Sequence, residues 1–119
     1  MKSIGDKFEV EAVNLVRATG MRILARNFSG KTGEVDIVAV ADDTLVFLEV
    51  RARRHPRYAS AAGSVDRRKQ LRILRTAQLF LQRYPQWAHM PCRFDVIAFD
   101  PRQSLCENRV TWIHAAFTA

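Results

Sequence analysis

Two strand-like segments joined by a very short turn constrain the fold of this chain more than any other feature. Residues 35–40 and 44–51 are rich in β-branched and aromatic side chains, and Asp42-Asp43 lies in the turn between them. A two-residue turn predicts an antiparallel hairpin, in which Asp36 stands directly opposite Glu49 and Glu34 opposite Arg51. Facing carboxylates destabilise a sheet, so a sequence selected for folding alone would avoid this pair.

The alternation of side chains along these strands separates charged from apolar residues. It predicts that the four charged residues share one patch, and that the opposite face holds Val35, Ile37, Ala39, Val46, Leu48 and Val50. Magnesium is bound by one or two carboxylates together with water and phosphate oxygens, so the patch is a candidate metal site. Two alternatives remain open: the strands are offset, or Glu34 and Arg51 form a surface ion pair that neutralises the cluster.

The remaining segments predict a single α/β domain over residues 1–119. Asp6 is the expected N-cap of a helix over residues 6–19 that stops at Gly20, and Ser64 that of a helix over residues 65–83. Strands are predicted at residues 21–28, 35–40, 44–51, 93–100 and 109–113, with a loop at residues 52–63. The order α-β-β-β-α-β-β fits a central mixed sheet flanked by helices.

The second predicted helix is strongly amphipathic, with one polar exception. Gln70 lies within its apolar arc, so this amide either caps a buried backbone group or points into a site. The apolar arc consists of Ile73, Leu74, Ala77, Phe80, Leu81 and Tyr84, and the opposite side carries Arg68, Arg72, Arg75 and Arg83.

The positive charge is concentrated in one segment. The chain has a net charge of +7, and residues 51–83 contain nine arginines, one lysine and a single acid. Such a block predicts a surface for a polyanion, because arginine binds phosphate oxygens in a bidentate way. The alternative is a merely solvated arginine-rich surface. The predicted nucleic-acid contacts are Arg53, Arg54, Arg57, Arg67, Arg68, Lys69, Arg72 and Arg75.

Several protein classes are not expected. Cys92 and Cys106 form no CxxC motif and predict reduced thiols. The longest purely apolar run, at residues 37–41, is far shorter than a membrane span, and the N-terminal residues lack the apolar stretch of a secretory signal. We therefore expect a cytoplasmic protein with no membrane association, and leave a homodimer open.

The hairpin also carries a resemblance. Residues 33–38 (GEVDIV) and 46–51 (VFLEVR), with Arg53, resemble the signature of the restriction-endonuclease-like superfamily, which is an Asp, a variable gap and then Glu-x-Lys. The whole chain resembles the YraN-like family of uncharacterised bacterial proteins, related in fold to archaeal Holliday-junction resolvases. Further matches are Gly5, Glu9-x-x-Ala12, Lys69-Gln70 and the CRFDV string at residues 92–96.

The resemblance implies a role for each matching residue. Asp36 and Glu49 would bind Mg²⁺ or Mn²⁺ with help from the Val50 carbonyl, and Glu9 would reach the site directly or through water. Gln70 would face the site. Arg51 occupies the lysine position of the superfamily pattern. Since arginine does not lose its proton in proteins, Arg51 could only orient water or stabilise negative charge on the phosphorus centre.

Taken together, these features predict a metal-dependent endonuclease that hydrolyses DNA phosphodiester bonds. Branched or junction DNA is the expected substrate by analogy of fold alone. The main alternative is a nucleic-acid-binding module with a vestigial metal site, and a third possibility is an interaction protein whose arginine face binds an acidic partner protein.

Overall fold

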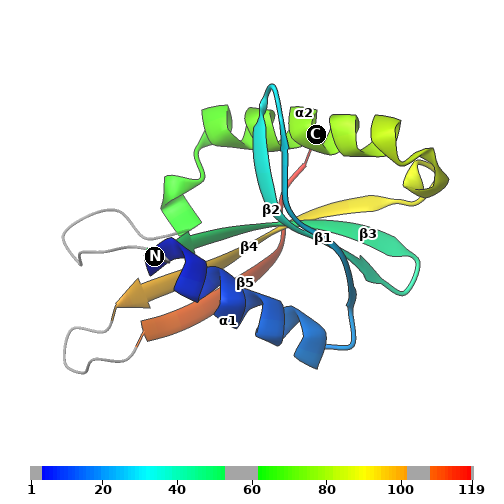
Figure 1. Cartoon of the computed structure of the whole chain (residues 1–119). Helices are drawn as coiled ribbons and strands as arrows, with labels where there is room; N and C mark the ends of the chain where they lie inside the picture. The colour runs from blue at the N-terminus through cyan, green and yellow to red at the C-terminus, as the bar shows by residue number, and fades with distance from the viewer. Residues whose placement is uncertain (1–3, 53–61, 102–107, 119) are drawn as a thin grey trace.

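Five strands form one mixed sheet in the order β1-β2-β3-β4-β5, with one helix on each face (Figure 1). The computed structural model describes residues 4–52, 62–101 and 108–118. The elements are α1 (Ile4–Ala18), β1 (Arg22–Gly30), β2 (Gly33–Ala41), β3 (Thr44–Ala52), the 3₁₀ turn η1 (Ala62–Ser64), α2 (Arg67–Arg83), the 3₁₀ turn η2 (Pro85–Trp87), β4 (Cys92–Pro101) and β5 (Asn108–Phe117). The predicted element order and the mixed sheet are confirmed.

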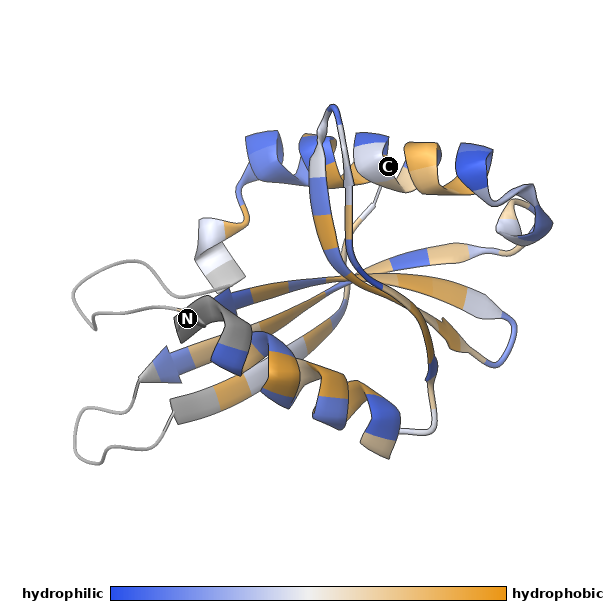
Figure 2. Ribbon diagram, in the orientation of Figure 1, coloured by the Kyte–Doolittle hydropathy of each residue, from blue (hydrophilic) through white to orange (hydrophobic). Residues whose placement is uncertain are grey.

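The only parallel neighbours in this sheet are β3 and β4, and the other neighbouring strands run antiparallel. A parallel pair needs a crossover connection, which α2 supplies. Side chains from successive positions of β3 and β4 enter two separate apolar clusters, one under α2 and one under α1. The hydropathy colouring shows both strands as largely apolar (Figure 2). Strand β3 is thus covered on both faces, and residues 45–49 are all buried.

Helix α1 buries Ala12, Val13 and Val16 against the sheet. It begins at Ile4, so the prediction that Asp6 caps the helix is wrong, and Asp6 lies inside the first turn. The predicted stop at Gly20 is confirmed: this glycine has a φ of 91°, a left-handed conformation that a glycine adopts without steric cost.

Helix α2 has the predicted amphipathic character. Ile73, Ala77 and Phe80 are buried, and the arginines of the opposite side are exposed. Its N-cap is Asp66, whose carboxylate accepts a hydrogen bond from the Lys69 N–H at 2.9 Å. The prediction of Ser64 as N-cap is wrong, because Ser64 is the last residue of η1 and the helix begins only at Arg67. No helix in the described ranges is long and apolar enough to span a membrane.

The β1–β2 hairpin curls over α2 rather than lying flat in the sheet (Figure 1). At its tip the hydroxyls of Thr32 and Thr76 are hydrogen-bonded at 2.8 Å, and a Cβ added to Gly30 would lie 2.8 Å from Leu79 Cδ1. The curl brings Val35 into the cluster under α2, whereas Ile37 packs under α1. The prediction that these two residues share a face is therefore wrong.

Strands β4 and β5 are joined through a buried carboxylate that the sequence analysis did not single out. Asp95 is 0% exposed, and it lies where the β4–β5 register shifts between Phe94 and Val96. Its carboxylate accepts two hydrogen bonds from Arg93, at 2.9 and 3.0 Å, one from the Trp112 indole at 3.0 Å and one from the Ala115 N–H at 2.9 Å. Four donors satisfy the carboxylate and fix β5 to β4.

We predict that Asp95→Ala lowers the free energy of unfolding by about 3 kcal/mol, because it leaves the Arg93 charge and two N–H donors without an acceptor. Urea unfolding followed by circular dichroism measures this loss. Asp43→Asn, in the exposed β2–β3 turn, is the control and should change stability by less than about 0.5 kcal/mol. An equally small effect of Asp95→Ala would mean that the donors find other partners.

Candidate metal centre

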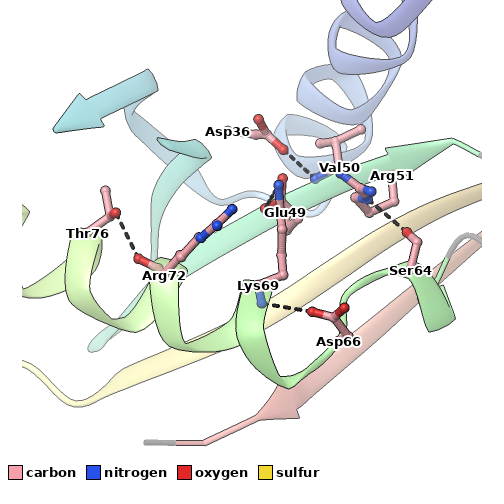
Figure 3. A network of polar contacts seen from close by, with 9 residues as sticks. All are labelled: Asp36, Glu49, Val50, Arg51, Ser64, Asp66, Lys69, Arg72 and Thr76. Carbon is pink, nitrogen blue, oxygen red and sulfur yellow. Dashed lines mark hydrogen bonds and ion pairs between the residues drawn. The ribbon is translucent and has the colours of Figure 1, made fainter. Parts of the chain in front are cut away.

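The β2–β3 hairpin has the predicted register. Its paired residues run from Ala41 and Thr44 at the turn to Ile37 and Leu48, so the alternative of offset strands is wrong. Beyond this last pair the Val50 N–H donates to Asp36 Oδ2 at 2.7 Å (Figure 3). The Asp36 carboxylate of β2 thus accepts a hydrogen bond from the main chain of β3. This bond holds the Asp36 side chain against β3, beside Glu49.

Glu49 is a buried carboxylate that is only partly satisfied. It is 4% exposed and forms a side-chain hydrogen bond with Asp36. The Nζ of Lys69 lies 3.7 Å from Glu49 Oε2, and no donor in the described part of the chain lies within hydrogen-bond distance of this oxygen. Buried carboxylate oxygens without a partner are rare and costly, so this atom needs an explanation.

The surroundings of Glu49 perturb its acidity. Burial, the hydrogen bond with Asp36 and the negative charge of Asp36 raise the pKa of Glu49 to about 9, although the positive charges of Lys69 and Arg51 oppose this rise. Burial and the charge of Asp36 also raise the pKa of Glu34, at the exposed edge of the same patch. At neutral pH Glu49 therefore holds a proton that a cation could replace.

Arg51 does not neutralise the acidic patch through a direct ion pair with Glu34. Its Nε donates to Ser64 Oγ at 2.9 Å, which directs the side chain toward η1 (Figure 3). Among the described residues no ion pair joins Arg51 to Glu34. The predicted surface ion pair is therefore absent from this part of the structure.

Gln70 and Glu9 lie on the two helices. The Gln70 amide donates to the Val65 carbonyl at 3.1 Å and accepts from Arg67 at 3.4 Å. Gln70 therefore caps a backbone carbonyl, which is the first of the two roles that its position in the apolar arc predicted. Glu9 is half-buried on α1, the helix that packs against β3. Catalytic roles for both residues stay predictions.

The predicted nucleic-acid contacts divide into two groups. Arg53, Arg54 and Arg57 lie outside the described residues. Arg67, Arg68, Arg72 and Arg75 are exposed on α2, and Lys69 is half-buried on the same helix. The structure thus brings one basic helix next to the acidic pair.

Comparisons with known proteins identify the family. Residues 8–99 match the family described as Uncharacterised protein family UPF0102. The chain belongs to family UPF0102. A UPF0102 protein of Pseudomonas entomophila (strain L48) is 45% identical over 113 residues, 95% of this chain and 91% of the relative. One from Stutzerimonas stutzeri (strain A1501) is 44% identical over 117 residues, 98% and 95% of the two chains. The predicted YraN-like membership is confirmed, and these names carry no activity.

The carboxylates of this UPF0102 chain suit a hard divalent cation. No group of three or more His, Cys, Asp or Glu side chains that could hold a metal occurs within residues 4–52, 62–101 and 108–118. Mg²⁺ does not need such a cage, because it commonly binds one or two carboxylates and completes its shell with water and phosphate oxygens. The unpartnered oxygen of Glu49, beside the anchored Asp36, fits this mode of binding.

One residue of the UPF0102 site was assigned only a surface role from the sequence. Lys69 was expected to contact nucleic acid, yet its ammonium group lies against Glu49. A signal was present: Lys69 is one helical turn before Ile73, at the end of the buried stripe of α2. This signal was missed because all basic residues of the arginine-rich segment were assigned together to a nucleic-acid surface.

We predict that the metal-free UPF0102 protein loses stability as the pH rises from about 5 to about 9. Between the ordinary pKa of 4.5 in the unfolded chain and about 9 in the folded one, Glu49 holds a proton only in the folded state. Raising the pH through this range therefore favours unfolding. Glu49→Gln mimics the protonated acid and should flatten this dependence.

Urea midpoints measured in EDTA across this pH range test the prediction. Glu11→Gln removes an exposed carboxylate of α1 and should keep the wild-type pH dependence. Parallel curves for wild type and Glu49→Gln would show that Glu49 is ionised in the folded protein.

Proposed function

We propose that this protein is a metal-dependent endonuclease that hydrolyses DNA phosphodiester bonds. The observation that carries the proposal is Glu49, buried beside Asp36 with an oxygen that lacks a hydrogen-bond partner among the described residues. A costly arrangement of this kind is typical of functional sites rather than of sites that serve folding alone. The arginine face of α2 lies next to it and supplies a surface for the phosphate backbone.

The carboxylates have distinct tasks in this proposal. Asp36, held by the Val50 N–H, and Glu49, which gives up its proton, would hold Mg²⁺ or Mn²⁺. A divalent cation held there supplies Lewis acidity, water activation and charge for the reacting phosphate. Arg51 keeps its positive charge at all relevant pH values and, held by Ser64, stabilises negative charge near the site without acting as a base.

The arginines of α2 suit the phosphate backbone better than base edges. Arg68, Arg72 and Arg75 follow one another on the exposed side of the helix. Seven residues of α-helix span about 10 Å, which corresponds to about three steps of one DNA strand at ~3.4 Å each. Contacts of this kind position a duplex without reading its sequence, so we expect little sequence specificity. Branched DNA is the proposed substrate by analogy of fold only.

A nucleic-acid-binding module without catalysis is the second candidate. The observation that favours it is Arg51, which occupies the lysine position of the superfamily pattern and is engaged with Ser64. Incubation of the purified protein with Mg²⁺ or Mn²⁺ and linear, single-stranded and four-way-junction DNA, and with RNA, separates the candidates. Binding without cleavage of any substrate favours the module, and absence of binding favours an acidic protein partner.

Glu49→Ala should abolish cleavage, because it removes a ligand of the cation, and should leave DNA affinity within a few-fold because the arginines remain. Asp36→Ala should behave in the same way. Gel-based cleavage and anisotropy measurements report the two properties separately. Glu11→Ala, on exposed α1, is the matched control and should cleave like the wild type. Full cleavage by Glu49→Ala would place the site elsewhere.

DNA affinity should fall steeply with salt. Contact with about five phosphates gives a slope of log K against log[salt] near −4.5, at about 0.9 per phosphate. Replacement of Arg68, Arg72 and Arg75 by Gln should reduce the slope by about 2.7 for the same reason. Replacement of Lys7 and Arg17, on α1, is the control and should leave it unchanged. An unchanged slope in the α2 variant would move binding toward the arginines at positions 53, 54 and 57.

A further inference from the structure

Lys69 occupies the boundary between the buried carboxylates and the basic face of α2. Its ammonium nitrogen lies 3.7 Å from Glu49 Oε2, and its side chain is 34% exposed while that of Glu49 is 5% exposed. The backbone is fixed at this point because the Lys69 N–H donates to the Asp66 cap. The four-carbon stem of lysine leaves the ammonium group able to move while its Cα stays in place.

Arg51 is not placed against Glu49 in the way that Lys69 is. Its Nε is hydrogen-bonded to Ser64 Oγ, and Figure 3 shows its side chain directed to η1 while Lys69 reaches Glu49 from α2. The ammonium of Lys69 is therefore the positive group that contacts the buried carboxylate. A compact ammonium with three donors also suits a single phosphate oxygen.

A divalent cation at Glu49 would lie close to the Lys69 ammonium, because Glu49 Oε2 is the atom nearest to it at the buried end of the contact. Such a cation would repel the ammonium group. The Lys69 side chain is 34% exposed and belongs to the same helix as the exposed arginines, so it can move toward solvent on the basic side of α2. Displacement would thus bring the lysine toward the substrate rather than into the core.

We propose that Lys69 has two successive roles: it lies against Glu49 in the metal-free protein, and after a divalent cation at Glu49 has repelled it, it binds a non-bridging oxygen of the scissile phosphate. This inference rests on the proposed nuclease function and adds a catalytic residue to it. Removal of the ammonium group then has two opposite effects. The cation loses a positive neighbour that repels it and binds more tightly, while the phosphate loses a positive contact and reacts more slowly.

The test compares Lys69→Met with Arg17→Gln, which removes one positive charge from an exposed position of α1, away from the basic face of α2. Mn²⁺ affinity is measured by calorimetry without DNA, duplex affinity by anisotropy in EDTA, and cleavage as a single-turnover rate with saturating Mg²⁺. For Lys69→Met we expect Mn²⁺ binding about fivefold tighter, equivalent to ~1 kcal/mol. We expect cleavage about 100-fold slower, as for loss of one electrostatic contact to a transition state.

The control and a conservative variant define the outcomes. Arg17→Gln should leave Mn²⁺ affinity, duplex affinity and the single-turnover rate near wild type. Lys69→Arg keeps the charge and should retain more cleavage than Lys69→Met.

Two results would overturn this inference, and both can be distinguished from a failure of the nuclease proposal. Wild-type cleavage by Lys69→Met would exclude the phosphate contact, and weaker Mn²⁺ binding by this variant would show that Lys69 only positions Glu49. In both cases the wild-type protein still cleaves. A wild-type protein that binds DNA but cleaves no substrate overturns the nuclease function itself, and the phosphate role of Lys69 with it.

Discussion

The burial of β3 on both faces is the constraint on which the rest of the structure depends. Helix α1 covers one face and α2 the other, so the side chains of residues 45–49 of β3 cannot reach water on either side. An acidic residue on this strand must find its partners inside the protein. Glu49 lies near the end of β3, and among the described residues it has the Asp36 hydrogen bond and the Lys69 ammonium at 3.7 Å. The raised pKa of Glu49 and its pairing with Asp36 follow from this exclusion of water.

Glu49 and Asp95, two buried carboxylates of the described residues, show how structural and functional acids differ. Asp95 accepts four hydrogen bonds, including a bidentate contact with Arg93, and needs nothing further. Glu49 is almost as buried, yet its Oε2 has no hydrogen-bond donor among the described residues. A carboxylate that serves folding is expected to be saturated, because each unsatisfied atom costs free energy. The difference in donor supply, rather than burial alone, therefore marks Glu49 as the functional candidate.

Features that depend on a local sequence pattern were predicted correctly. Features that depend on contacts between distant parts of the chain were not. The register that places Asp36 beside Glu49 follows from one turn and the alternation of two strands, and the arc around Ile73 follows from helical periodicity. The face occupied by Val35 depends on the curl of the hairpin over α2, which the contact between Thr32 and Thr76 fixes across more than forty residues of chain. Two of the four donors of Asp95 likewise come from β5, which follows β4 along the chain.

The crossover from β3 to β4 explains why residues 49 and 69 meet at all. Because these strands are parallel, the chain must return from the end of β3 to the side of the sheet where β3 begins before β4 can start. Helix α2 makes that return. The first turn of α2 consequently lies over the end of β3, where the crevice outside the carboxyl ends of strands commonly holds ligands in α/β sheets. The same geometry leaves Arg68 exposed on the helix while Lys69 turns inward to Glu49, and Figure 3 shows the Arg72 side chain directed from the next turn toward the same carboxylate. A single topological requirement therefore places the buried acids, the inward lysine and the arginines at the start of α2 within one region.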